Sequence, residues 1–308
     1  MSFLNPTPVP VTLYSSEDAD APQIDRANWR GAIKTIFKAC LVTGYGGKTG
    51  QGWRIEEEDT DKATFTPGDP AAANVGLYVD SSRTSYSRFD LVWQGVRANI
   101  PEDKRMRLGQ NPSWGNPTQP WYLLATPRSV CFLPIYTSGA FAASVMLYFG
   151  QICHNLTHPA GQDFAYYLPC VYGGWNLSTL EADTWSTSPL LYSAGSLGAA
   201  GTVAAMNANV RSAASSYLNG GSAPLADPVT ASRLYAPLYI TRGGEFIGQI
   251  PGLLIPSHRL ESDATGQVMR IDDSPHDWLF THQTSNVVSS LRGSRGCGLL
   301  VNCNEWVY

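Results

Sequence analysis

The sequence has few charged residues: they make up 15% of the 308 positions, whereas a typical soluble domain carries about a quarter. Lys and Arg (21 in total) are scattered and are outnumbered by Asp and Glu (25), which gives a net charge of -4. The chain therefore offers no basic face, and we expect no direct binding of nucleic acid. Few surface charges suit a protein that packs among partners, and they are equally typical of an ordinary β-rich protein.

Long apolar runs and targeting signals are also lacking. The start of the sequence has neither a basic region nor an apolar stretch of the kind found in signal peptides. The best candidate for a membrane span, Val130 to Phe149, is interrupted by Pro134 and Gly139. We therefore expect no membrane partner, and a protein that is made in a cytoplasm and stays soluble or assembles there. None of the six cysteines forms a CxxC pair, and Cys40 and Cys131 lie among apolar residues, as small core side chains do.

A glycine-rich stretch is the nearest approach to a nucleotide-binding motif, with the sequence Gly44-Tyr45-Gly46-Gly47-Lys48-Thr49. A P-loop needs a glycine five positions before its Gly-Lys-Thr, and Val42 stands there instead. A helix also precedes the glycines, whereas a phosphate-binding loop leads into one. A helix C-terminus followed by a turn accounts for these residues, so we expect no cofactor.

Histidines give no stronger indication of chemistry. His154 and His158 have the spacing of two ligands on one helical face, but Pro159 disfavours a helix at this point. Asp273, His276 and His282 could supply a hydrolase triad with a serine. No G-x-S-x-G sequence holds a nucleophile. We therefore assign no catalytic or metal-binding residue and expect the protein not to be an enzyme.

Carbohydrate chemistry is the remaining alternative. Glycan cleavage needs two carboxylates beside a sugar cleft, and the acidic run Glu56 to Asp59, with Asp61, is more typical of a solvated turn. Nine Trp and fifteen Tyr either line a carbohydrate-binding surface or fill a β-rich core and its interfaces. A carbohydrate-recognising module therefore stays open as an alternative.

One helix is clearly predicted, over residues 26–42. Its apolar residues recur at helical spacing, at Ile33, Ile36, Phe37, Cys40 and Leu41. Asp25 or Asn28 is the expected N-cap, and Gly44 is the expected residue just after the C-terminus. Lys34 is expected on the solvent-facing side, so its replacement by Ala should change stability little.

Strand signals dominate the rest of the chain. Short runs of aromatic and β-branched residues are separated by Gly, Pro and Asn; the clearest are Leu77 to Val79, Arg88 to Gln94, Trp121 to Ala125, Val130 to Tyr136, Leu234 to Ile240, Glu245 to Pro256 and Cys297 to Cys303. Weaker signals cover 140–149 and 170–173, and the stretch from Pro101 to Pro120 indicates a long exposed loop. The sequence thus predicts an α+β fold, predominantly β, with antiparallel sheets in a β-sandwich-like core and one amphipathic helix near the N-terminus.

Four regions follow from composition. Residues 1–24 form a proline-stiffened arm and first strand, and such an arm either reaches a neighbouring subunit or frays. Residues 25–177 hold the helix and a β-rich core, and residues 233–308 supply strands that complete it. Between them, residues 178–232 form a Ser/Ala/Gly-rich insertion with few large apolar side chains. This insertion either gains order against a neighbour in an assembly or is a mobile surface loop.

Several blocks of the chain resemble a family of uncharacterised tailed-bacteriophage virion proteins. The opening match is the segment Leu41-Val42-Thr43-Gly44-Tyr45-Gly46-Gly47-Lys48-Thr49, followed by the strand-like block Gly76 to Arg83. Later blocks, in the expected order, are Trp121 to Leu133, Tyr148 to Ile152, and Arg242 to Leu253 with Pro256-Ser257-His258 after it. The family has no assigned reaction, so the resemblance carries over no catalytic residue.

The resemblance implies a non-enzymatic structural component of a tailed bacteriophage particle. The expected place is the tail or baseplate, in a symmetric ring or array of identical copies beside other virion proteins. A head-decoration or head-tail connector protein is the first alternative, and a carbohydrate-recognising module on the virion is the second. The expected location is the virion, assembled in the host bacterial cytoplasm.

Overall fold

The computed structural model describes most of the N-terminal half and the strands of the C-terminal half. The described residues are 7–25, 29–72, 75–83, 86–93, 96–97, 106–109, 118–138, 141–144, 146–154, 163–167, 190–193, 206–211, 235–242, 245–256, 265–271, 274–283 and 297–308. The fold is α+β and predominantly β, as the sequence predicts, with antiparallel sheets and one short helical segment.

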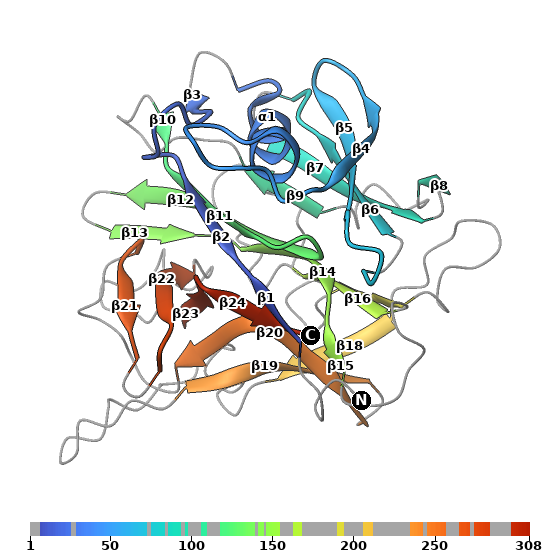
Figure 1. Cartoon of the computed structure of the whole chain (residues 1–308), viewed down its shortest axis with the longest axis vertical. Coiled ribbons are helices and arrows are strands. Elements are labelled where there is room, and N and C mark those ends of the chain that lie inside the picture. The colour runs from blue at the N-terminus through green and yellow to red at the C-terminus, as the bar shows by residue number, and fades with distance from the viewer. Residues whose placement is uncertain are drawn as a thin grey trace.

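The described elements form three layers (Figure 1). The upper layer is a six-stranded sheet of β4 (Arg54–Glu58), β5 (Lys62–Thr66), β6 (Val75–Asp80), β7 (Tyr86–Trp93), β8 (Val96–Arg97) and β9 (Met106–Gly109). The helix α1 (Ala32–Lys38) and the π-helical turn η1 (Ala39–Thr43) pack against this sheet.

The middle and lower layers belong to one fourteen-stranded sheet that folds over on itself. Its strand order is β13 (Phe141–Ser144), β22 (Asp277–Gln283), β23 (Cys297–Asn302), β20 (Glu245–Pro256), β19 (Tyr235–Arg242), β18 (Met206–Arg211), β17 (Leu190–Ser193), β16 (Asp163–Tyr167), β14 (Leu147–Gln151), β12 (Ser129–Ser138), β11 (Trp121–Ala125) and β2 (Thr12–Ser15). Two short strands join beside this path, β15 (Cys153–His154) on β20 and β21 (Val268–Arg270) on β22. At the other end of this order, β13 pairs with β12 as well as with β22. The end of the sheet formed by β13 is therefore hydrogen-bonded back to the middle layer.

The middle layer is formed by β2, β11, β12 and β14, and the last three of these strands are buried on both faces. Side chains alternate along a strand, so one set points up and the other down. The upward set joins the helix in the upper core and comprises Trp121, Leu123, Ala125, Val130, Phe132, Leu147 and Phe149. The downward set joins the lower core and comprises Leu124, Cys131, Leu133 and Tyr148. Burial on both faces explains why these strands are nearly continuous hydrophobic runs in the sequence.

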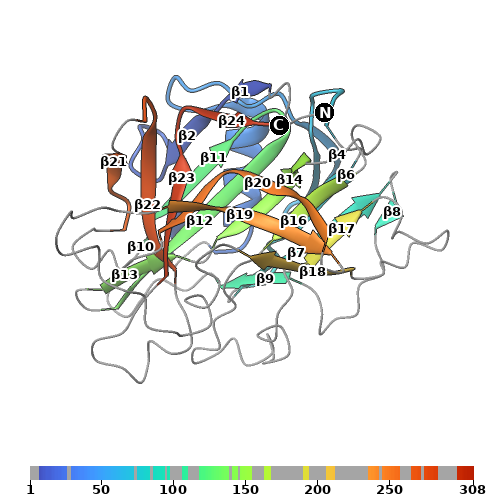
Figure 2. The ribbon, with the colours of Figure 1, turned by 90° about the horizontal axis from the view of Figure 1, so that it is seen from below.

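The lower layer, formed by β19, β20, β22 and β23, covers the downward face of the middle layer (Figure 2). Its buried contribution includes Ile250, Leu253, Leu279 and Val301. All of the strongly predicted strands are found, and the ends of most fall within two residues of the expected positions. The 170–173 signal lies outside the described residues.

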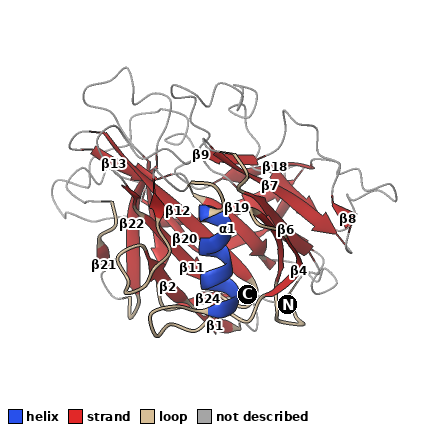
Figure 3. Ribbon diagram, turned by 90° about the horizontal axis from the view of Figure 1, so that it is seen from above, coloured by secondary structure: helices blue, strands red, loops and turns tan. Residues whose placement is uncertain are grey.

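The helix lies across the strands of the middle layer (Figure 3), and its apolar side is the one expected. Ile33, Ile36, Phe37, Cys40 and Leu41 are all fully buried. The helix ends at Gly44, as predicted; this residue has φ of 78°, and its N–H donates to the carbonyl of Ala39.

Two expectations about the helix are wrong. It begins at Ala32, after Gly31 with φ of 75°, and Asp25, one of the two expected caps, lies in a strand. Lys34 does not face solvent: it is 8% exposed, and its Nζ lies 2.6 Å from Oε1 of Glu58. The long aliphatic stem of a lysine can pack against apolar residues while its ammonium group reaches a carboxylate. Helical spacing alone therefore predicts the wrong environment for Lys34.

The described part of the N-terminal arm forms three strands, and each pairs with a strand from a later part of the chain. β1 (Pro8–Pro10) pairs with β24 (Glu305–Val307), β2 pairs with β11, and β3 (Ile24–Asp25) pairs with β10 (Thr118–Gln119). The described part of the arm is thus paired within its own chain.

Two segments contain more strand than their composition suggests. The stretch from Pro101 to Pro120 was expected to be a loop, but β9 within it pairs with β7, and β10 pairs with β3. Within residues 178–232, β17 and β18 form part of the large sheet between β16 and β19. The rest of both segments lies outside the described residues.

Candidate functional site

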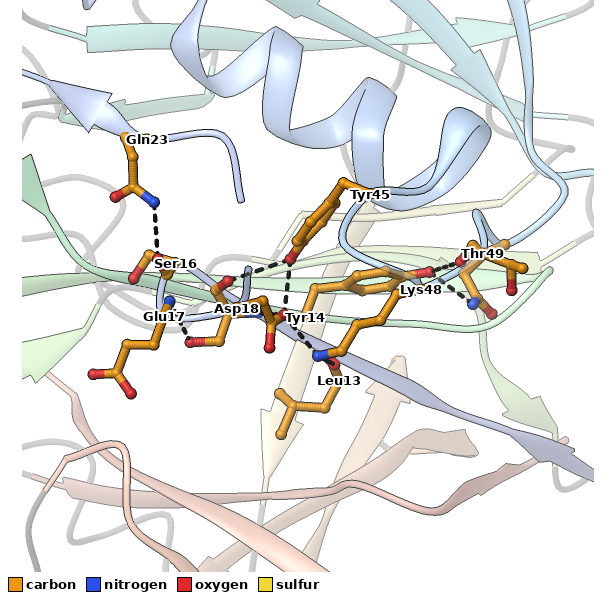
Figure 4. A network of polar contacts seen from close by, with 11 residues as sticks. Leu13, Tyr14, Ser16, Glu17, Asp18, Gln23, Tyr45, Lys48 and Thr49 are labelled. Atoms are coloured by element: carbon orange, nitrogen blue, oxygen red, sulfur yellow. Dashed lines mark hydrogen bonds and ion pairs between the residues drawn. The ribbon is translucent and has the colours of Figure 1, made fainter. Parts of the chain in front are cut away.

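The glycine-rich turn that resembles a phosphate-binding motif packs against strand β2, where Asp18, Tyr45 and Lys48 form a polar cluster (Figure 4). The Nζ atom of Lys48 lies 2.6 Å from Oδ2 of Asp18 and donates a 2.8 Å hydrogen bond to the carbonyl oxygen of Leu13. The hydroxyl of Tyr45 donates to the same Asp18 oxygen at 3.0 Å. These three side chains are called the arm cluster below.

Neighbouring contacts extend the same connection. The hydroxyl of Tyr14 donates to the carbonyl of Thr49, and the side-chain amide of Gln51 donates to Tyr14 and to Thr12, at 3.0 and 2.8 Å. The segment after the helix is therefore bonded to β2 along most of that strand's length.

Glycine is required here because of backbone geometry. A Cβ atom on Gly46 would lie 2.0 Å from the carbonyl oxygen of Ala19, and one on Gly44 would lie 2.3 Å from that of Lys48. Both residues also have positive φ, of 55° and 78°. Because Gly46 has no side chain, the turn can approach the arm closely enough for Lys48 to reach Asp18.

The electrostatics of the arm cluster are those of a paired carboxylate. Burial acts to raise the pKa of Asp18, but hydrogen bonds from Lys48, the Ser15 amide and Tyr45 outweigh it and hold the pKa below its ordinary value. Burial raises the pKa of Tyr14 to about 12 and also raises that of Tyr45. Burial raises the pKa of the nearby Cys40 thiol well above its usual range, which keeps it protonated and unreactive.

These contacts hold the glycine-rich turn against the N-terminal arm. The Lys48 ammonium is occupied by Asp18 and a backbone carbonyl, both in the arm. This arrangement supports the interpretation of the glycines as a helix end and turn. Sequence reasoning missed Asp18 as the partner of Lys48, because the two residues are thirty positions apart and no local spacing connects them.

A second polar cluster joins the upper sheet to the lower core. Nε of Arg128 lies 2.6 Å from Oδ2 of Asp69, and the Arg128 guanidinium carbon lies 5.3 Å from the centre of the Tyr308 ring. The Tyr308 hydroxyl bonds to Thr126 at 2.9 Å, and the carbonyl of Thr126 accepts from the indole of Trp53 at 2.8 Å. These bonds satisfy polar groups that the three-layer packing buries.

The candidate catalytic residues are only partly described. His158 and Asp273 lie outside the described residues, while the backbones of His154 and His282 are in β15 and β22. Nε2 of His276 lies 3.6 Å from a carboxylate oxygen of Glu305, at ion-pairing distance when the imidazole is protonated. Among the described residues, no group of three His, Cys, Asp or Glu side chains is placed to share a metal ion.

The acidic run from Glu56 to Asp59, expected to be a solvated turn, is mostly an exposed strand. Its first three residues belong to β4, at the edge of the upper sheet, and the turn begins only at Asp59. Glu58 pairs with Lys34 and Lys38 of the helix at 2.6 and 2.9 Å, and these bonds lower its pKa. Residues 56–58 are all exposed on an edge strand, where charges discourage unwanted pairing.

No protein-family model, curated protein or solved structure matches the chain. Within the described part of the chain, no helix is long and apolar enough to span a membrane.

Proposed function

We propose that this protein is a non-enzymatic structural component of a tailed bacteriophage particle, placed in the tail or baseplate as a symmetric ring or array. The proposal starts from the sequence blocks that resemble phage virion proteins. The observation that carries it is where the described parts of those blocks lie. They form the turn after the helix and buried strands of the sheets.

The opening block shows this most clearly. The segment from Leu41 to Thr49 ends the helix, makes the glycine-rich turn and ties that turn to the arm through Lys48. The block from Trp121 to Leu133 forms β11 and the first half of β12, which are buried on both faces. These blocks set the geometry of the framework, and a component of a symmetric assembly needs such a framework to present its contact surfaces.

The burial of tryptophan side chains counts against carbohydrate recognition by these residues. Trp53, Trp121, Trp278 and Trp306 are buried, and Trp29 is half-buried. A sugar-binding platform needs such rings at the surface, and these described rings pack among apolar side chains instead. The carbohydrate alternative therefore receives no support from these residues.

The decisive experiment is to locate the chain in purified particles. Particles are purified from infected cells, the chain is sought by mass spectrometry, and an epitope-tagged copy is located by immunogold electron microscopy. We expect the chain in stoichiometric amount and gold at the tail or baseplate. Gold on the head instead would favour the decoration or connector alternative, and absence of the chain from purified particles would refute the structural role.

A further inference from the structure

Strand β2 lies at an edge of the large sheet. It is the last strand in the sheet order among the described residues, with β11 as its only partner in that order. An edge strand presents unpaired backbone groups on its outer side, and such groups are a template for a strand from another molecule. The outward groups of β2 therefore need to be accounted for.

The register identifies which groups point outward. Ser16 donates its backbone N–H to Trp121, so the alternate residues Tyr14 and Thr12 also face β11. Leu13 and Ser15, between them, direct their backbone groups away from the sheet.

Side chains of the arm cluster bind these outward groups. The carbonyl of Leu13 accepts from Lys48 Nζ at 2.8 Å, and the N–H of Ser15 donates to Asp18 Oδ2 at 2.8 Å. The carbonyl of Ser15 accepts from the Tyr45 hydroxyl at 3.3 Å and from the N–H of Asp18 at 3.1 Å. Three outward backbone groups on two successive outward-facing residues are thus bonded within the chain (Figure 4).

We propose that Asp18, Tyr45 and Lys48 form an edge cap that prevents a second copy of this chain from adding a strand to β2. A second copy is the relevant occupant because the same strand in two copies can pair antiparallel about a two-fold axis, which requires no other sequence. The cap belongs to the free subunit and does not depend on the proposed place in a virion.

The test removes the lysine of the cap, and with it the bond to the Leu13 carbonyl, without removing the packing. Lys48→Met keeps an unbranched stem of similar length but loses the ammonium group that bonds to Leu13 and Asp18. Lys38→Met is the matched control, since it removes one lysine from an ion pair distant from β2. Sedimentation velocity over a wide concentration range is compared for the unmodified chain and both variants, with circular dichroism to confirm folding.

We expect Lys48→Met to gain a concentration-dependent species that sediments faster than any species of the unmodified chain or of Lys38→Met. A second substitution, Ser15→Pro, should abolish that species, because it removes an outward N–H while leaving the ladder to β11 intact. An unchanged sedimentation profile for folded Lys48→Met would overturn the proposal, as would a new species that persists with Ser15→Pro.

A milder variant covers the case in which Lys48→Met fails to fold. Tyr45→Phe removes only the hydroxyl that bonds to Ser15 and Asp18, so the fold is retained. Hydrogen exchange in the peptide that spans β2, followed by mass spectrometry, should then be faster than in the unmodified chain, and weak self-association should appear. Faster exchange with no self-association would show that the cluster only ties the arm, and the edge-cap proposal would be rejected.

Discussion

Lys48 and Asp18 are thirty positions apart in sequence, yet the Lys48 ammonium lies 2.6 Å from the Asp18 carboxylate. This pair connects the glycine-rich turn after the helix to the turn that ends β2. The lysine of an apparent nucleotide motif is thereby part of the connection between the arm and the rest of the fold.

Gly46 should be far less replaceable than its neighbour Gly47. Both have positive φ, so an alanine at either position costs about 1–2 kcal/mol in backbone strain. Only at Gly46 would the new Cβ meet a backbone atom, 2.0 Å away, whereas nothing lies within 4 Å at Gly47. Urea denaturation should show a clearly larger loss for Gly46→Ala than for Gly47→Ala, and equal losses would contradict the close approach to the arm.

Phe37 should be a major contributor to the upper core. Its ring lies 5.9, 6.0 and 5.3 Å from the rings of Phe65, Phe89 and Phe132. Phe37→Ala should lower the free energy of unfolding by about 3–5 kcal/mol, because the cavity spans two layers. Thr35→Ala, at an exposed position of the same helix, should change it by about 0.5 kcal/mol or less. Similar losses from both variants in chemical denaturation would mean that the helix face is wrongly assigned.

Acid should weaken the arm cluster. The folded-state pKa of Asp18 lies below its ordinary value of 3.8, so its pairing stabilises the fold above that pH. The contribution is lost as pH falls through the folded pKa. Thermal denaturation from pH 6 down to pH 3 should therefore show a shallower acid-induced decrease in Tm for Asp18→Asn than for the unmodified chain. Glu56→Gln, at an exposed position, is the control, and an unchanged acid limb for Asp18→Asn would refute the prediction.

The buried thiols should react only after unfolding. Burial raises the pKa of Cys40 and Cys131 well above the usual range. A thiol that stays protonated and inaccessible is a poor nucleophile. A short iodoacetamide pulse on the native protein, analysed by peptide mass spectrometry, should leave these two unlabelled, and the same pulse in urea should label them. Rapid native labelling of Cys40 would contradict its burial under the arm cluster.

The sequence predicts those parts of the fold whose signal is local. The helix face from Ile33 to Leu41 and the strands from Trp121 to Tyr136 follow from spacing and residue type, because burial imposes its period on the chain. The position of Lys34 did not follow, since a long side chain can lie along apolar neighbours and still reach Glu58. The start of the helix was also missed, because Gly31 supplies the turn where a polar cap was expected.

Contacts between distant segments were beyond local reasoning. The glycines at 44 and 46 could be recognised as turn residues, but nothing nearby in the sequence shows that Ala19 lies against Gly46. In the same way, β9 consists of four residues in a proline-rich stretch, and its pairing with β7 depends on the sheet beside it. Tertiary context decides such short strands, and composition alone favours a loop.

The pairing of β1 with β24 has a consequence for how the chain folds. Thr7 and Tyr308 exchange backbone hydrogen bonds of 3.1 and 3.2 Å. The segment that contains β1 and the segment that contains β24 therefore form one antiparallel pair. Such a contact joins residues about 300 positions apart, and its loop-closure entropy must be overcome late in folding. On the ribosome, β1 emerges early but must wait for its partner until synthesis reaches β24. We therefore expect the native state to form slowly and only after translation of this region.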